Sequence, residues 1–173
     1  MECENMMQKR IINPEHIKSL IEMLNNAPYY QLLGLRVTKL ESGYAEVIMN
    51  AEKKHWNPFG SLHEGAYASL MDTAVYWAAY CDLEEDTGFT SLDLSVTNLA
   101  MSSSGILIAR GNAIKEGRST CLCEGMIYDE NGKKLAHGTS KLLILQNRQT
   151  VSDAMQEMGY SSLPNKFIYS EGE

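Results

Sequence analysis

Residues 62–81 read LHEGAYASLMDTAVYWAAYC, and this stretch constrains how the rest of the chain folds. It is rich in alanine, leucine, methionine and aromatic residues, it contains no proline, and it contains no glycine after Gly65. A segment that is apolar on nearly all sides over this length is typical of a buried helix rather than of a surface helix. Within residues 65–81, Asp72 is the only charged residue.

The flanking segments have the patterns of a second helix and of strands. Asn13 and Pro14 begin an amphipathic helix that we expect to end near Asn25, and a short apolar turn at 28–33, closed by Gly34, follows it. Alternating apolar residues and turn residues predict strands at 35–40, 44–50, 89–101, 105–115, 118–128 and 133–145, and a short helix at 152–158. One long buried helix among antiparallel hairpins predicts an α+β fold, in which a curved antiparallel sheet wraps the central helix.

The chain of 173 residues has the length of one such domain with additions. We expect an accessory helical segment at 1–27, the main domain at 28–146 and a second accessory segment at 147–173. No apolar run approaches the roughly 18 residues of a membrane span, and the first residues lack the apolar core of a signal peptide. These features predict a cytoplasmic protein with no membrane partner.

Charge and composition argue against several classes of function. A net charge of -7 disfavours a nucleic-acid partner, because nucleic-acid-binding surfaces are normally basic. The four cysteines lack the spacing of a zinc site or of a redox motif, and we expect them to be reduced: Cys3, Cys81, Cys121 and Cys123. Three histidines also lack a partner at metal-ligand spacing, which indicates structural or exposed positions: His16, His55 and His137. We therefore expect no metal ion.

Asp72 is costly to bury, because no lysine or arginine lies between His55 and Ala109. Desolvation disfavours the ionised form, so the carboxylate must find hydrogen-bond donors or its pKa must rise. Gly65 and Ser69 share a helical face with Asp72, and such small residues would let a ligand or a strand approach. Because buried carboxylates also serve structural purposes, both roles stay open at this point.

Two short motifs carry a resemblance to a known family. Residues 57–65, NPFGSLHEG, and 69–74, SLMDTA, resemble the N-x-x-G-x-x-H-G-G and L-x-D signature of PaaI-type thioesterases, which have the hotdog fold. The spacing agrees throughout, and the resemblance extends over about residues 28–145. It implies hydrolysis of an acyl-CoA thioester to a free acid and coenzyme A, without a cofactor. It also implies a homodimer or homotetramer with the sites at subunit interfaces.

The resemblance implies a role for each residue of the site. Asp72 matches the helix carboxylate that acts as general base or as nucleophile. Asn57 and the backbone amide of Glu64 match the groups that hold the thioester carbonyl, a role that suits the unpaired amides of a helix start. Ser91 matches the residue that orients the water, and we expect it to share a strand face with Asp93.

The remaining matched residues are expected to bind substrate or to shape the loop. His63 matches a histidine that organises the loop, and Gly65 gives the substrate room. Phe59 is one of several aromatic residues that suggest an apolar pocket. Coenzyme A phosphates need a cation, and the usual position at the end of the third strand has none. Arg118 is the best match among four candidates, each of which could equally be a solvated surface charge: Lys115, Arg118, Lys133 and Lys134.

Glu64 stands where the family has glycine, and this departure keeps an alternative open. Ser61 and Glu64 have the spacing of a capping box, in which the Glu64 side chain accepts from the Ser61 amide. If Ser61 also capped the Glu64 amide, that amide would not be free for a thioester. A non-catalytic acyl-CoA-binding or lipid-binding hotdog protein is therefore the alternative. A hotdog dehydratase would need an Asp/His pair at a spacing that the sequence lacks.

Overall fold

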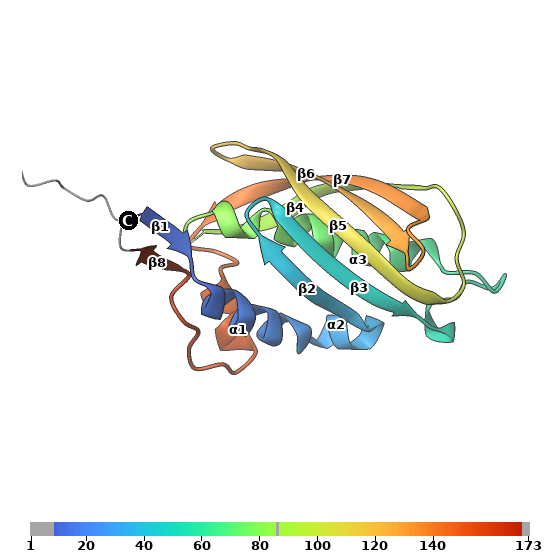
Figure 1. Cartoon of the computed structure of the whole chain (residues 1–173), viewed down its shortest axis with the longest axis horizontal. Helices are drawn as coiled ribbons and strands as arrows, with labels where there is room; N and C mark the ends of the chain where they lie inside the picture. The colour runs from blue at the N-terminus through green and yellow to red at the C-terminus, as the bar shows by residue number, and fades with distance from the viewer. Residues whose placement is uncertain (1–8, 86, 171–173) are drawn as a thin grey trace, which may run out of the picture.

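A computed structural model describes residues 9–85 and 87–170, in which a six-stranded antiparallel sheet curves around one long helix (Figure 1). The helix is α3 (Glu64–Ala78). The strands are β2 (Leu35–Glu41), β3 (Tyr44–Ala51), β4 (Thr87–Asn98), β5 (Gly105–Glu116), β6 (Thr120–Asp129) and β7 (Lys134–Gln146). They lie in the order β2-β3-β5-β6-β7-β4, so β2 and β4 are the edges. The predicted α+β fold is confirmed, with all six strands close to their expected positions.

A row of glycines brings α3 close to the sheet. Gly111, Gly125 and Gly138 are paired across β5, β6 and β7. A Cβ atom on Gly111 would lie 2.3 Å from the Ala74 carbonyl oxygen, and one on Gly125 would lie 2.6 Å from the Met71 sulfur. Ala74 and Met71 are fully buried. The absence of side chains at these three positions therefore forms the groove in which the helix packs.

Two helices precede the sheet. α1 (Pro14–Asn25) begins as predicted, with the Asn13 side chain accepting a hydrogen bond from the Glu15 amide. Residues 28–33, predicted as a turn, instead form the helix α2 (Pro28–Leu33). The reason is local: Pro28 is favoured in the first turn of a helix, and Gly34, at φ 66°, ends it in the left-handed conformation.

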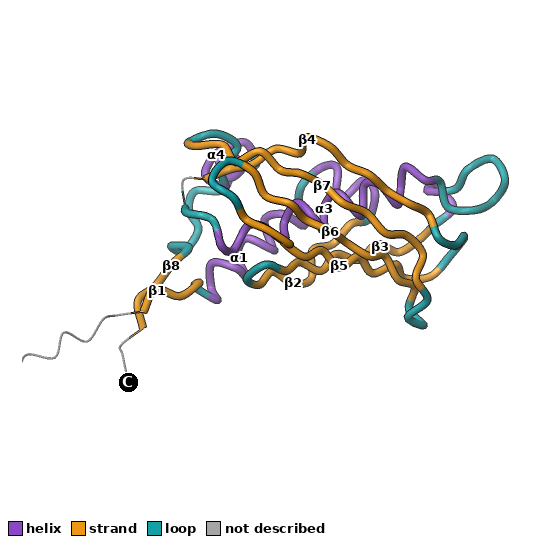
Figure 2. The backbone as a smooth tube through the Cα atoms, turned by 90° about the horizontal axis from the view of Figure 1, so that it is seen from above, coloured by secondary structure: helices purple, strands orange, loops and turns teal. Residues whose placement is uncertain are grey.

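The two accessory segments meet in a small sheet that the sequence did not predict. β1 (Lys9–Ile12) pairs antiparallel with β8 (Phe167–Ser170). Between β7 and β8 lies α4 (Val151–Glu157), which Figure 2 shows beside the start of β4. Single 3-10 turns occur at η1 (Lys53–His55) and η2 (Tyr80–Asp82). The division into a main domain and accessory segments stays a prediction. In the described ranges, no helix has the length and hydropathy to cross a membrane.

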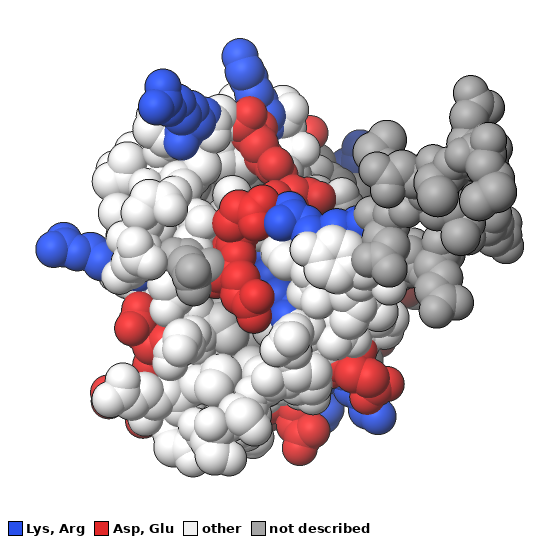
Figure 3. Space-filling model, turned by 90° about the vertical axis from the view of Figure 1, so that its left-hand side faces the viewer, with Lys and Arg blue, Asp and Glu red and all other residues white. Residues whose placement is uncertain are grey.

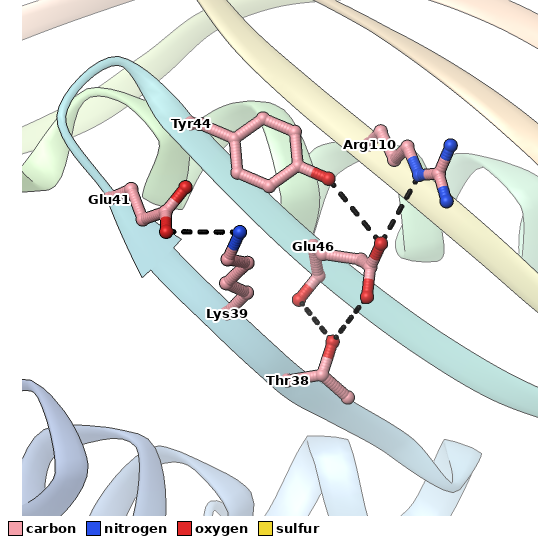
Figure 4. A network of polar contacts seen from close by, with 6 residues as sticks. All are labelled: Thr38, Lys39, Glu41, Tyr44, Glu46 and Arg110. Carbon is pink, nitrogen blue, oxygen red and sulfur yellow. Dashed lines mark hydrogen bonds and ion pairs between the residues drawn. The ribbon is translucent and has the colours of Figure 1, made fainter.

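The outer face of β2, β3 and β5 carries a network of polar contacts (Figure 4). Glu46 accepts hydrogen bonds from Thr38 at 3.1 Å and from Arg110 at 3.2 Å. A register shift between Val37 and Lys39 sets Thr38 out of the regular pairing. Solvated ion pairs of this kind contribute little stability. The network therefore needs no functional explanation.

The described cysteines behave as core residues. Cys121 and Cys123 are 1% and 0% exposed, with their sulfurs 3.6 Å apart on the inner side of β6. Cys81 is also buried and free. The prediction that the β6 pair fills core space is confirmed, whereas Cys3 lies outside the described residues.

Candidate functional site

A cleft of about 520 Å³ lies beside the middle of α3. The helix contributes one wall, α2 contributes a second, and β4 contributes Leu94. Asp72 is the only ionisable carboxylate among its lining residues, which are Tyr29, Tyr30, Ala68, Ser69, Asp72, Thr73, Tyr76, Trp77 and Leu94. The carboxylate expected to be buried thus reaches a cavity that a ligand could enter.

The surroundings of Asp72 disfavour its charge. Burial raises the pKa of Asp72, and the hydrogen bond from Ser91 opposes part of that rise. The Ser91 hydroxyl lies 3.1 Å from Oδ1 of Asp72. Among the residues that the structure describes, Oδ2 has no hydrogen-bond partner. A partly desolvated carboxylate with one free oxygen is a stronger base than an aspartate in water.

A β-bulge places Ser91 against the helix. The register of β4 against β7 shifts between Ser91 and Asp93, so Leu92 is an extra residue in the strand. Ser91 contacts Asp72, whereas Asp93 is exposed and forms an ion pair with Lys141 at 3.0 Å. The expectation that Ser91 and Asp93 share one face was therefore wrong. An extra residue reverses the alternation of side chains along a strand.

The sequence analysis missed the tyrosines of α2 that complete the cleft. The hydroxyl groups of Tyr29 and Ser69 are 2.7 Å apart, and the Trp77 indole N–H donates to the Tyr30 hydroxyl at 2.8 Å. The signal for these residues was an aromatic pair directly after Pro28. It was not used because the segment was taken for a turn.

A second group of predicted residues lies at the start of α3. Asn57 organises the preceding loop: its Oδ1 accepts from the amides of Phe59 and Ser61, and its Nδ2 donates to the Ser61 hydroxyl at 2.9 Å. One hydrogen of Nδ2 remains for another acceptor. Phe59 is 93% exposed at the tip of this loop and does not line the Asp72 cleft.

The predicted capping box at Ser61 and Glu64 does not form. His63 caps the helix instead, with its Nδ1 accepting from the Gly65 amide at 2.8 Å. The physical reason is that α3 begins at Glu64, which puts Ser61 two residues before the cap. In the described chain, the Glu64 amide has no hydrogen-bond partner. The objection to this amide as a carbonyl-binding group is thereby removed.

The predicted residues fall into separate groups within one chain. Asp72 and Ser91 are together, whereas Asn57, His63 and the Glu64 amide belong to the other end of α3. Eight residues of helix, roughly 12 Å at 1.5 Å per residue, separate Glu64 from Asp72. Arg118 lies on a third element, the exposed turn between β5 and β6.

Two of the histidines are structural, as expected. His16 is buried, with Nε2 2.6 Å from the Tyr80 hydroxyl. His55 is buried and bonds to the Glu52 amide and to the Leu33 carbonyl. No group of three or more metal-ligating side chains occurs in residues 9–85 and 87–170.

Comparisons with known proteins decide the family. The model of the thioesterase superfamily matches residues 59–136. The proofreading thioesterase EntH of Klebsiella pneumoniae is 32% identical over 102 residues, which cover 59% of this chain and 74% of that protein. The chain belongs to the thioesterase superfamily. A 1,4-dihydroxy-2-naphthoyl-CoA hydrolase of Listeria monocytogenes is 29% identical over 119 residues, covering 69% of this chain and 97% of that protein.

A solved structure agrees with this assignment at the level of the fold. The crystal structure of a thioesterase from Haemophilus influenzae aligns with a TM-score of 0.71 at 24% identity, over 76% of this chain and 92% of that one. The hotdog fold expected from the motifs is confirmed. As a member of the superfamily, the protein is a thioester hydrolase.

Proposed function

We propose that the protein hydrolyses an acyl-CoA thioester to a free acid and coenzyme A, with Asp72 as the catalytic carboxylate. The observation that carries this proposal is the state of Asp72: it lines a cleft of about 520 Å³, burial raises its pKa, and only one of its oxygens is bonded in the described chain. Such a carboxylate can take a proton from water or attack the thioester carbon directly. Neither route calls for a metal or redox cofactor.

Ser91 is a positioning residue in this proposal. Its bond to Oδ1 fixes the carboxylate plane and leaves Oδ2 directed to the reacting water or thioester. The hydroxyl can also bond the water itself, as the resemblance to PaaI-type enzymes implies. Its position at a β-bulge suits this use, because bulges redirect a side chain out of the regular sheet pattern.

The carbonyl-binding groups of each site come from a second copy of the chain. The Glu64 amide lies roughly 12 Å along the helix from Asp72, and one carbonyl cannot lie within hydrogen-bonding reach of both. A homodimer resolves this if the start of α3 in one subunit faces Asp72 of the other. There the Glu64 amide and the remaining hydrogen of Asn57 Nδ2 would stabilise the oxyanion.

The other predicted residues have supporting roles in that assembly. His63 holds the first turn of α3 in place through the Gly65 amide. The exposed Phe59 and Arg118 lie outside the cleft of their own chain, so in this proposal they would contact substrate bound at the interface. Arg118 supplies a cation for the coenzyme A phosphates. Two such dimers would form the tetramer.

Subunit mixing tests the shared site directly. Asp72→Asn and Asn57→Ala are each expected to reduce the turnover of a panel of acyl-CoAs. Turnover is measured as the release of the free thiol of coenzyme A. A heterodimer of the two variants contains one intact site, so unfolding and refolding an equal mixture restores about a quarter of wild-type activity by random pairing. The wild-type protein taken through the same refolding is the control. If the mixture stays as inactive as its parts, the site does not combine Asn57 and Asp72 from two subunits.

The alternative is acyl-CoA binding without turnover. It predicts that calorimetry detects binding of acyl-CoAs while no free thiol is released by the wild-type protein. That outcome would overturn hydrolysis and leave the binding function.

A further inference from the structure

A second cavity of about 540 Å³ adjoins the Asp72 cleft. The two cavities share Tyr76 and Trp77, which lie about one helical turn beyond Asp72 on α3. The floor of the second cavity is aromatic: Tyr76 lies 4.2 Å from Phe89 and 5.4 Å from Trp77 between ring centroids. Its other wall is α4 with the residues just before it. We refer to this second cavity as the α4 chamber.

The wall of the α4 chamber is fixed by several specific features. Asn147 and Gln149 have φ angles of 54° and 51°, which non-glycine residues adopt only at a cost in free energy. A Cβ on Gly88 would lie 2.0 Å from the Arg148 carbonyl oxygen, so only glycine permits this approach of the chain to β4. α4 then begins with a capping box between Thr150 and Asp153. The chain is thus turned back sharply and held over the aromatic floor.

This wall is formed by a part of the chain that the family model does not include. That model ends at residue 136, and the Listeria hydrolase is almost fully matched by 69% of this chain. The strained turn therefore lies outside the residues that the family model matches. Strained backbone conformations cluster at functional sites, where the surrounding structure holds them in place.

The charge of both cavities indicates what they can hold. No lysine, arginine or histidine occurs among the described residues that line them, whereas Asp72, Asp153 and Glu157 do. Acidic side chains also form a band on the end of the molecule that Figure 3 shows, with basic side chains directly beside them. Within the two cavities themselves, phosphate groups would lack the cationic partners that they need. An uncharged apolar group suits the aromatic floor.

We propose that the α4 chamber binds the far end of the substrate's acyl chain, and that Tyr76 forms the lip which the chain crosses. This inference rests on the proposed acyl-CoA hydrolysis and names its substrate class: thioesters of medium-length and longer fatty acids. The distance supports that class, since α3 and η2 advance roughly 12 Å from Asp72 to Tyr80 at the far side of the chamber. Tyr76 is held at the lip by its hydroxyl, which donates to the Phe89 carbonyl at 2.8 Å.

Filling the chamber from α4 tests the proposal. Ala154 lines the chamber, so Ala154→Trp is expected to lower kcat/KM for decanoyl-CoA by roughly ten-fold or more, while kcat/KM for acetyl-CoA is unchanged. Gln156→Trp is the matched control, because Gln156 is exposed on the same helix and does not line the chamber. Glu157→Trp, at an exposed lining position, gives the same selective loss if Ala154→Trp does not fold. Equal losses on both substrates, or no loss on decanoyl-CoA, would overturn the proposal.

Binding of 1-decanol, an uncharged probe of the same chain length, separates this inference from the hydrolysis on which it rests. Calorimetry is expected to show 1-decanol binding to the wild-type protein and to Gln156→Trp, and its loss in Ala154→Trp. If this pattern appears but no acyl-CoA is hydrolysed, the proposed role of the α4 chamber is supported and the proposed hydrolysis is contradicted. If acyl-CoAs are hydrolysed but the Ala154 and Glu157 variants keep the wild-type preference for chain length, the role of the chamber is contradicted and the hydrolysis is supported.

Discussion

Asp72 and Lys166 are two ionisable side chains that the fold removes from water, and their surroundings differ. Lys166 is 0% exposed, and its Nζ donates to the carbonyls of Tyr80 at 2.7 Å and Leu83 at 2.5 Å. The same Nζ lies 3.9 Å from the centre of the Tyr80 ring. Asp72 is half-buried, has Ser91 as its one donor in the described chain, and lines a cleft. The two buried charges therefore differ in their fixed partners and in their access to a cavity, rather than in burial alone.

Lys166 and Asp72 also lie in different parts of the molecule. Lys166 joins the C-terminal segment to the end of α3, where its carbonyl partners lie in and just after η2. Burial lowers the pKa of Lys166 to about 8 and raises the pKa of Asp72, so desolvation acts against the charge in both cases. Of the two groups, Asp72 is the one that lines a cleft which a ligand could enter.

The largest effect is expected from Asp72→Asn. If this carboxylate performs the chemistry, kcat falls by roughly 10²- to 10⁴-fold, the usual contribution of a positioned acid or base. The melting temperature is expected to hold or rise, since a desolvated charge is removed. Asp93→Asn is the matched control, because Asp93 is an exposed aspartate on β4 that does not line the cleft, and it should retain activity. A large loss of stability with unchanged kcat would make Asp72 structural like Lys166.

Lys166→Met should show the opposite pattern. The Leu83 carbonyl loses its hydrogen-bond donor, so the free energy of unfolding is expected to fall by about 1–3 kcal/mol in denaturant titrations. Turnover of a short acyl-CoA should stay at the wild-type level. Lys141→Met, which removes an exposed ion pair, is the control and should cost less than about 1 kcal/mol. Unchanged stability in Lys166→Met would show that the lysine does not hold the C-terminal segment.

The sequence predicted the fold well because its signals are local. The apolar run around Asp72 and the turns at Gly43, Gly117 and Gly132 define the central helix and most strand ends. The strand order and the β1–β8 pairing could not be predicted, because they depend on contacts between residues far apart in the sequence. Lys166 was missed for the same reason: it lies in a polar segment, and only the folded chain places it in the interior.

The candidate site was predicted unevenly. Asp72 stood out as a lone charge in an apolar helix, and the motif resemblance led to Ser91, which the structure places 3.1 Å from it. The prediction that Asp93 shares a strand face with Ser91 was wrong, because the bulge between them arises from the pairing of β4 with β7, which the sequence of one strand does not reveal. The capping box was wrong because His63, an uncommon cap, competes with Ser61. Local patterns identify residue types well, but tertiary contacts decide which of them meet.

The pH dependence of stability tests the comparison between Lys166 and Asp72. Its pKa is about 8 in the folded protein and 10.5 in the unfolded chain, so the unfolded chain binds more protons between these values. Stability relative to Lys166→Met is therefore expected to increase with pH across this window, by at most about 1.4 kcal/mol per pH unit. Asp72 has the opposite sign: its folded pKa is raised, so stability relative to Asp72→Asn decreases as pH rises above about 3.8. A decrease with pH for Lys166 would contradict its desolvated state.

The smallest effect is expected from Ser91→Ala, which tests whether Ser91 sets the pKa of Asp72 or orients the water. The Ser91 hydroxyl favours the ionised carboxylate, so Ser91→Ala should raise the pKa of Asp72 further. A single hydrogen bond contributes about 0.5–1.5 kcal/mol, which corresponds to a shift of up to about one pH unit. The acidic limb of the kcat/KM profile should therefore move to higher pH, while Ser91→Thr, which keeps the hydroxyl, should leave it in place. A lower kcat with an unmoved limb would mean that Ser91 orients the water rather than tuning Asp72. The acidic limb should disappear altogether in Asp72→Asn, which ties it to this carboxylate and not to another group in the cleft.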